Sequence, residues 1–259
     1  MLDLVIRNGQ VITPQGAGLW DVGVRGEQIA VIAAPSTLPT DAARVIDAAG
    51  LIVSPGGVEP HAHLAHGIMS HPEEPAITLG PEDDTRGMAC GGTTTHIDFA
   101  YVRPGSDIQP VIEQRASRWK GNSYVDYAFH LTLAGALPIR VFDQIGEAIA
   151  AGHPSFKVFT TNVLPPHPKR AGNRIDFGRI HFAMEKVAKA GGIMVVHGED
   201  EDLVQFNYER FREEGRMDGT NLHLVHTKLS ELLAFRRTVA LAKASGAGVY
   251  FVHVSAREG

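Results

Sequence analysis

The 259-residue sequence predicts an α/β fold in which helices cover a parallel sheet, and three observations support this prediction. From Leu51 onward, short apolar runs alternate with segments that carry apolar residues at helical spacing. The composition, with 44% hydrophobic and 20% charged residues, is that of a globular protein and not of a disordered or fibrous one. No apolar run approaches the roughly 18 residues that a membrane helix needs.

Residues 1–50 are expected to form a separate small β module, a portion of a β-sandwich. Apolar and polar residues alternate from Leu2 to Ile6, and we expect Asn8-Gly9 to form a hairpin turn and Arg25–Glu27 a second turn. A module of this size buries little surface. We therefore expect it to need strands from elsewhere in the polypeptide.

Residues 51–259 are expected to contain about six β-then-α units. The expected strands are Leu51–Val53, Thr93–Phe99, Val125–Leu131, Ser155–Phe159, Ile193–His197 and Val249–Val254. Helical spacing appears at 108–119, at 180–188 with Gly191-Gly192 as the C-cap, and from Leu229 to about Lys243. A closed barrel needs eight units. An open doubly wound sheet is the alternative, although the G-x-G-x-x-G fingerprint is absent.

Composition also limits location and partners. The net charge of -5 offers no basic surface for a nucleic acid. Cys90 is the one cysteine, which excludes an internal disulfide and favours a reducing compartment. The N-terminus lacks the pattern of a signal peptide. We therefore expect a cytoplasmic protein with neither nucleic acid nor membrane as a partner. Because the sequence stops just after an apolar strand, we also expect it to be part of a longer polypeptide.

Histidines and one lysine recur at the ends of the expected strands. His61 and His63 are two residues apart in extended chain, so both rings point to the same side and can reach one metal ion. His197 and His253 each end an apolar strand, and Lys157 lies within one. Each of these alone is more often an ordinary core or snorkelling side chain. Together, at matching strand ends, they indicate a catalytic site.

With these residues, the chain resembles the cyclic amidohydrolases. Within that family it is most similar to the hydantoinases and dihydropyrimidinases. The resemblance covers essentially the whole sequence and rests on six segments: Leu4–Gly9, Pro55–His63, Gly91–Phe99, Ser155–Phe159, Val196–Glu199 and Phe251–Ser255. It implies a (β/α)8 barrel, of which residues 51–259 supply about six units. It also implies a β-sandwich, which residues 1–50 share with later strands, and a homotetramer.

The resemblance also assigns roles to residues. His61 and His63 would bind one divalent ion and His197 and His253 a second one, with zinc as the usual metal. Lys157, carboxylated by CO2, would bridge the two ions. The general-base aspartate of the family would lie beyond Gly259, so these residues alone would be inactive.

Other positions receive secondary roles from the same comparison. Asn162 stands where the family commonly has a tyrosine that donates to the developing oxyanion. Glu59 and Asp98 would orient the metal ligands from outside. The remaining histidines are assigned to the core or surface by default: His66, His71, His130, His153, His167, His181, His223 and His226.

The implied activity is hydrolysis of a cyclic amide C–N bond by a hydroxide that bridges two metals. A hydantoin or dihydropyrimidine ring would open to an N-carbamoyl or ureido acid. Allantoinase or dihydroorotase activity is the alternative within the class, although Arg103 fits no carboxylate-binding pattern that we can identify. A mononuclear deaminase would leave Lys157 without a role. A non-catalytic dihydropyrimidinase-like scaffold is the alternative from another class.

Overall fold

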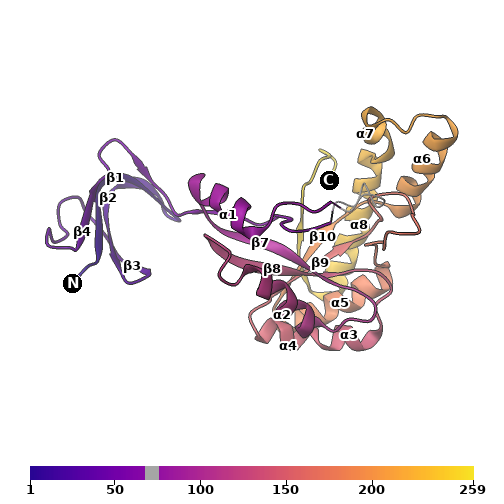
Figure 1. Cartoon of the computed structure of the whole chain (residues 1–259), viewed down its shortest axis with the longest axis horizontal. Helices are drawn as coiled ribbons and strands as arrows, with labels where there is room; N and C mark the ends of the chain where they lie inside the picture. The colour runs from indigo at the N-terminus through magenta and orange to yellow at the C-terminus, as the bar shows by residue number, and fades with distance from the viewer. Residues whose placement is uncertain (68–75) are drawn as a thin grey trace. The chain divides into compact units, whose positions relative to one another are not determined.

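The chain forms two compact units, Met1–Gly57 and Val58–Gly259, which are described separately. The computed structural model (Figure 1) describes residues 1–67 and 76–259. Among these residues, no helix is both long enough and apolar enough to cross a membrane.

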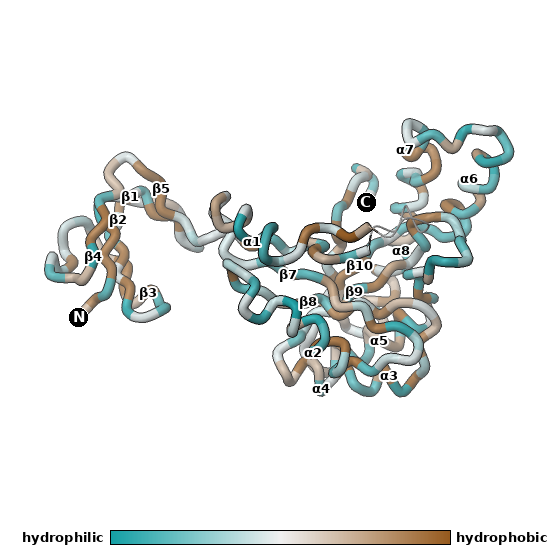
Figure 2. Tube along the Cα trace, in the orientation of Figure 1, coloured by the Kyte–Doolittle hydropathy of each residue, from teal (hydrophilic) through white to brown (hydrophobic). Residues whose placement is uncertain are grey.

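The first unit is a five-stranded sheet. Its strands are β1 (Leu4–Thr13), β2 (Gly16–Arg25), β3 (Gln28–Ala33), β4 (Arg44–Asp47) and β5 (Ile52–Val53). The order is β3-β2-β1-β4, with β5 also paired to β1. Its buried apolar side chains are Val5, Val11, Val22 and Ala48. The strands β1 and β2 are apolar along much of their length (Figure 2).

Two expectations for this region are wrong. Asn8-Gly9 is not a hairpin turn, because β1 continues through it with a bulge between Ile6 and Gly9, and Asn8 adopts a φ of 63°. The chain instead reverses between Thr13 and Gly16. The segment 51–53, expected as a strand of the barrel sheet, supplies β5, which pairs in parallel with β1.

The second unit contains a six-stranded sheet with helices between its strands. The strands are β6 (Gly57–Glu59), β7 (Thr93–Val102), β8 (Asp126–Leu133), β9 (Ser155–Phe159), β10 (Ile193–His197) and β11 (Gly248–Phe251). The order along the sheet is β11-β10-β9-β8-β7-β6, and the neighbours from β7 to β11 pair in parallel. The order never reverses, which is the arrangement of a β/α barrel and not of a doubly wound sheet. The chain therefore contains a curled, partial barrel sheet.

Helices connect these strands. They are α1 (Pro81–Cys90), α2 (Ile108–Trp119), α3 (Ile139–Asp143), α4 (Ile145–Ala150), α5 (Phe177–Ala190), α6 (Glu201–Glu213), α7 (Leu222–Val225) and α8 (Lys228–Ser245), with a short 3₁₀ turn at Gly219–Asn221. Helices α2 to α5 lie together on one side of the sheet (Figure 1). The expected cap of α5 is confirmed, because Gly191 adopts a left-handed φ of 79°.

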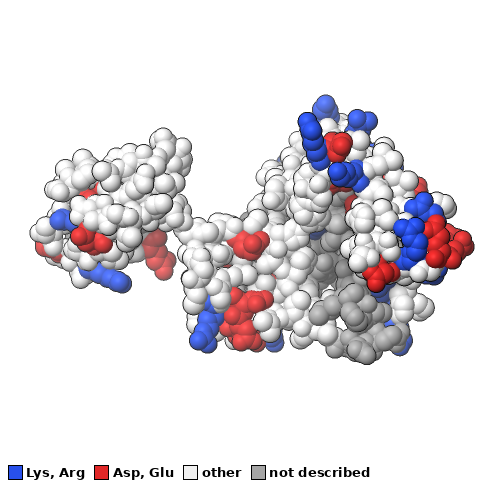
Figure 3. All heavy atoms as spheres, turned by 90° about the horizontal axis from the view of Figure 1, so that it is seen from above, with Lys and Arg blue, Asp and Glu red and all other residues white. Residues whose placement is uncertain are grey.

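The core of this unit lies between the sheet and these helices. Trp119, Leu131, Phe142 and Phe156 are among its largest fully buried side chains. Charged side chains of both signs occupy the face drawn in Figure 3. In the same unit, Arg216 Nη1 lies 2.8 Å from Glu214 Oε2. The buried core holds the strands in place, and the ends of these strands carry the polar side chains of the candidate site.

Candidate active site

Four imidazoles lie together at one end of the parallel sheet. His61 and His63 follow β6, His197 is the last residue of β10, and His253 follows β11. Ring centroids are 5.2 Å apart for His61 and His63, 5.4 Å for His61 and His253, and 4.7 Å for His197 and His253. The four rings line a cavity of about 720 Å³. The sheet therefore brings together histidines that are distant in the sequence.

Lys157 lies in the middle of β9 and is fully buried. Within the described part of the chain, its Nζ has no hydrogen-bond partner. The amine lies 5.5 Å from the ring centroid of Phe99 and 4.9 Å from that of Phe159. Burial lowers the pKa of the Lys157 amine to about 7. A large fraction of this amine is therefore uncharged, and nucleophilic, at neutral pH.

Burial also keeps the imidazoles neutral. Burial, followed by the charge of Lys157, lowers the pKa of His61 to about 3. Burial is again the largest cause for His63 and His253, whose pKa values both fall to about 4. The pKa of His197 is lowered mainly by burial. Neutral imidazole is the form that binds a metal ion.

The backbone at His253 is strained. Its φ of 35° lies in the left-handed region, which few residues other than glycine adopt. The next residues are held by Glu231 of α8, whose carboxylate accepts hydrogen bonds from Ser255 N at 2.8 Å and Ala256 N at 2.5 Å. This clamp supports the unusual conformation that turns the His253 ring toward His197.

Two carboxylates hold the segment that carries His61 and His63. Glu59 Oε1 accepts a hydrogen bond from His61 N at 2.8 Å. Asp98, fully buried in β7, accepts from Leu64 N at 2.9 Å and Arg115 Nη2 at 3.0 Å. Burial favours a raised pKa for Asp98, but the hydrogen bond from His66 and the charge of Arg115 outweigh it and lower the pKa. Neither carboxylate lines the cavity among the imidazoles.

Comparisons with known proteins find relatives along nearly the whole chain. No protein-family model matches the chain. Over 257 residues, 99% of the chain, it is 30% identical to a D-hydantoinase of Ralstonia pickettii. It is also 30% identical to an allantoinase of Escherichia coli (strain K12 / DH10B), over 99% of the chain. The crystal structure of dihydropyrimidinase from Brevibacillus agri NCHU1002 superposes with a TM-score of 0.87 at 27% identity, covering 98% of the chain.

The chain is therefore homologous, over nearly its whole length, to cyclic amidohydrolases. It spans about half the length of the relatives it matches, with 53% of the D-hydantoinase, 54% of the allantoinase and 52% of the dihydropyrimidinase covered.

Asn162 lies away from the imidazoles. Its amide Nδ2 donates to Glu201 Oε1 at 3.0 Å, and its Oδ1 accepts from Arg174 N at 3.1 Å. It lines a separate cavity of about 160 Å³, formed with residues 163–167 and 170–173. The Asn162 amide is therefore engaged with the start of α6 and with its own loop, and Asn162 does not line the cavity of the histidines.

The cavity of the histidines also contains residues that sequence reasoning assigned elsewhere. His66, expected in the core or on the surface, lines the histidine cavity, and its Nε2 lies 2.7 Å from Asp98 Oδ1. Arg103 also lines this cavity. His130 lies behind it, with Nε2 2.9 Å from Pro60 O. His71 lies outside the described residues.

The acidic run after His197 combines two roles. Asp200 caps α6 by accepting from Leu203 N at 3.1 Å, as its position in the sequence indicates. Glu199 instead contacts two imidazoles, with Oε2 2.7 Å from His197 Nε2 and Oε1 2.7 Å from His226 Nδ1. Acidic residues at this position in a sequence usually complement the N-terminus of a helix, whereas Glu199 holds two imidazoles.

Proposed function

We propose that this chain supplies the metal-binding part of an enzyme that hydrolyses the C–N bond of a cyclic amide. The substrate would be a hydantoin or dihydropyrimidine, opened to an N-carbamoyl or ureido acid. One observation carries the proposal: the fully buried amine of Lys157 has no hydrogen-bond partner among the described residues and lies beside four neutral imidazoles. A protein interior rarely tolerates such a group unless another group compensates it.

The residues fit a metal centre by their chemistry. As they lie, no three His, Cys, Asp or Glu side chains in residues 1–67 and 76–259 are grouped so that they could hold a metal ion. Carboxylation of Lys157 by CO2 would supply the anionic oxygens that the imidazoles lack, and the lowered pKa of its amine favours that reaction. We infer that His61 and His63 hold one divalent ion and His197 and His253 another. Carbamylated Lys157 would bridge the two, and zinc is the metal that imidazoles and carboxylate-like oxygens commonly bind.

Two divalent ions, when bound, would lower the pKa of a shared water and polarise the amide carbonyl. The chain's own residues would hold this centre in place. Glu59 and Asp98 hold the backbone of residues 61–64 through the bonds to His61 N and Leu64 N. Glu231 holds the backbone just after His253. Phe99 and Phe159 keep the Lys157 side chain out of water.

We further propose that a longer polypeptide completes the site. The relatives are about twice as long as the matched region, and a closed barrel needs two strands beyond the six in this sheet. On this proposal, later residues supply those strands, the general-base aspartate and the rest of the β-sandwich around residues 1–50. The enzyme would be a homotetramer, and residues 1–259 alone would not turn over substrate.

The test is a hydrolysis screen of the complete polypeptide with hydantoin, dihydrouracil, allantoin and dihydroorotate, combined with metal analysis. We expect ring opening of hydantoin or dihydrouracil, two metal ions per chain, and loss of activity when CO2 and bicarbonate are removed. Preference for allantoin would favour the function in the name of the Escherichia coli relative. One metal without CO2 dependence would favour a deaminase, and folded, metal-free, inactive protein would favour a scaffold.

A further inference from the structure

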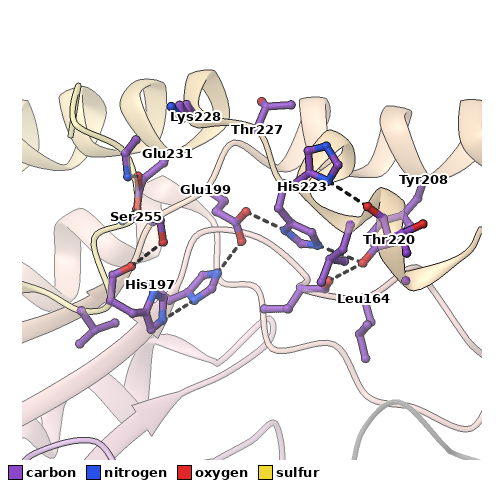
Figure 4. Close-up of a pocket in the computed structure, with 18 residues that line it drawn as sticks. Leu164, His197, Glu199, Tyr208, Thr220, His223, Thr227, Lys228, Glu231 and Ser255 are labelled. Carbon is purple, nitrogen blue, oxygen red and sulfur yellow. Dashed lines mark hydrogen bonds and ion pairs between the residues drawn. The ribbon is translucent and has the colours of Figure 1, made fainter.

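A chain of hydrogen bonds leads away from His197 toward the helical side of the site. His197 Nε2 lies 2.7 Å from Glu199 Oε2, and Glu199 Oε1 lies 2.7 Å from His226 Nδ1. His226 Nε2 lies 3.0 Å from the hydroxyl of Tyr208. Figure 4 shows Glu199 between the His197 ring and Tyr208 of α6. These side chains line one cavity of about 590 Å³, next to the site already described.

The carboxylate at the centre of this chain determines where protons lie. An ionised carboxylate can only accept hydrogen bonds, so both imidazoles must donate to Glu199. His197 therefore carries its proton on Nε2, and its Nδ1 keeps a lone pair. That Nδ1 lies 3.0 Å from His253 Nε2, on the side where the proposed metal site lies.

This series of hydrogen bonds is anchored to the β9 loop at Glu199 and at Tyr208. Glu199 N donates to Thr160 Oγ1 at 2.8 Å, and Thr160 Oγ1 donates to Glu199 O at 2.6 Å. The Tyr208 hydroxyl of α6 donates to Val163 O at 3.1 Å. The side chains are shielded from water, with 11% of His197, 13% of Glu199 and 17% of His226 exposed. Thr160 and Val163 both follow β9, so the chain ties the β9 loop, the β10 end and α6 together.

We propose that Glu199 and His226 are positioning residues, which lock His197 in the tautomer and orientation that direct Nδ1 toward His253 and the metal. This inference rests on the proposed metal-dependent function. Carboxylates that accept from the second nitrogen of a metal-binding histidine fix its tautomer, and their loss typically costs 10–100-fold in metal affinity. His226 prevents the Glu199 carboxylate from rotating away, because it holds the other oxygen.

The test combines a spectroscopic readout with metal affinity. In the 259-residue chain labelled with ¹⁵N-histidine and free of metal, long-range ¹H–¹⁵N spectra report which ring nitrogen of His197 carries the proton. We expect Nε2. Zn²⁺ affinity is then measured by chelator competition in bicarbonate buffer. We expect Glu199→Ala to mix the two His197 tautomers and to weaken Zn²⁺ binding about 10–100-fold. His226→Gln should weaken it several-fold in the same direction.

His223→Gln is the matched control. His223 lines the same cavity, but its Nδ1 donates to Thr220 O at 2.9 Å. It does not belong to the series of hydrogen bonds that links His197, Glu199 and His226. We expect no change in tautomer or affinity. A proton on Nδ1 of His197 in the unsubstituted chain would overturn the proposal, and this observation requires no variant to fold. An unchanged tautomer and Zn²⁺ affinity in Glu199→Ala would overturn it as well. If the unsubstituted chain carries the proton on Nε2 but binds no Zn²⁺, the metal-dependent function fails while the positioning of His197 stands.

Discussion

The amine of Lys157 is fully buried and forms no hydrogen bond with the described residues. Substitution of Lys157 therefore tests its role through the free energy of unfolding, without an activity assay. In the metal-free chain, Lys157→Met should leave the free energy of unfolding unchanged or raise it by about 1–3 kcal/mol, because a group buried without a partner is removed. In the variant, Zn²⁺ with bicarbonate should no longer stabilise the fold. In the unsubstituted chain it should add about 2.7 kcal/mol at a Zn²⁺ concentration 100 times Kd. Urea unfolding with and without Zn²⁺ measures both.

Lys186→Met is the control for this substitution. Lys186 Nζ pairs with Asp143 Oδ1 at 2.6 Å on the surface, and loss of such a pair changes stability by about 0–1 kcal/mol. It should leave the response to Zn²⁺ intact. A Lys157→Met chain that is less stable without metal and still stabilised by Zn²⁺ would contradict the role of Lys157.

The imidazoles predict how the metal-free fold responds to acid. In the folded chain the pKa of His61 is about 3 and that of His253 about 4, below the ordinary value of 6.5. At pH values between the folded-state pKa values and 6.5, the unfolded chain binds more protons than the folded one. The free energy of unfolding therefore falls as pH drops from 6.5 toward 4 and is retained above pH 6.5. We expect the urea midpoint of His61→Gln to fall less than that of the unsubstituted chain between pH 7 and 4.5. His223→Gln, which alters an exposed ring, should follow the unsubstituted chain, and equal slopes for His61→Gln would refute the prediction.

Sequence reasoning could bring some residues of the site together but not others. His61 and His63 share a side of extended chain, and His197 and His253 end apolar strands, so strand geometry alone predicts that they meet. His66 is different, because its partner Asp98 is 32 residues away in the sequence. Glu199 and His226 are 27 residues apart. No local sequence pattern indicates such contacts. Glu199 also precedes three acidic residues at the start of α6, and such residues are typical of a helix N-terminus.

Among the elements, the α5 helix provides a test of local capping. Asp176 precedes it and accepts a hydrogen bond from Arg179 N at 3.0 Å. Asp176→Ala should lower the free energy of unfolding by about 1 kcal/mol, because a backbone N–H at the helix start loses its acceptor. Asp176→Asn keeps an acceptor in place and should lose less than half as much. Thermal unfolding of the two variants checks this order, and equal losses would show that the charge matters and the cap does not.

The elements that sequence patterns locate are those with strong periodicity or continuous burial. The strands expected at Ser155–Phe159 and Ile193–His197 are found at those residues, because nearly every side chain in them is buried. Helix α1 was not expected, because only Pro81 and Thr85 of it are buried and an apolar stripe is absent. The hairpin turn predicted at Asn8-Gly9 is wrong because a bulge and a hairpin turn both favour residues that tolerate positive φ.

Strand order is a property of the whole molecule that one sequence does not reveal. The alternation of strands and helices is compatible with a barrel and with a doubly wound sheet, because both bury apolar parallel strands under helices. The choice depends on whether each crossover continues in one direction. From β6 to β11 every strand lies beside its neighbour in sequence. This order places the carboxyl ends of β6, β9, β10 and β11 at the same edge of a curled sheet, where the histidines of the site lie.

The two units predict different behaviour when they are produced separately. The core of residues 58–259 contains a large apolar cluster that includes Leu131, Phe156 and Met194. Residues 1–57 bury few apolar side chains and leave Leu19, Ile29 and Ile52 exposed by 64%, 63% and 68%. A segment this short buries only a marginal share of its surface. We expect the peptide 1–57 to lack a cooperative thermal transition by circular dichroism and to bind a hydrophobic dye, whereas 58–259 unfolds cooperatively. A cooperative transition of the peptide 1–57 would mean that its few buried residues, with the buried Asp21 that accepts from Asn8 N and Ser36 N, suffice to hold the sheet without further strands.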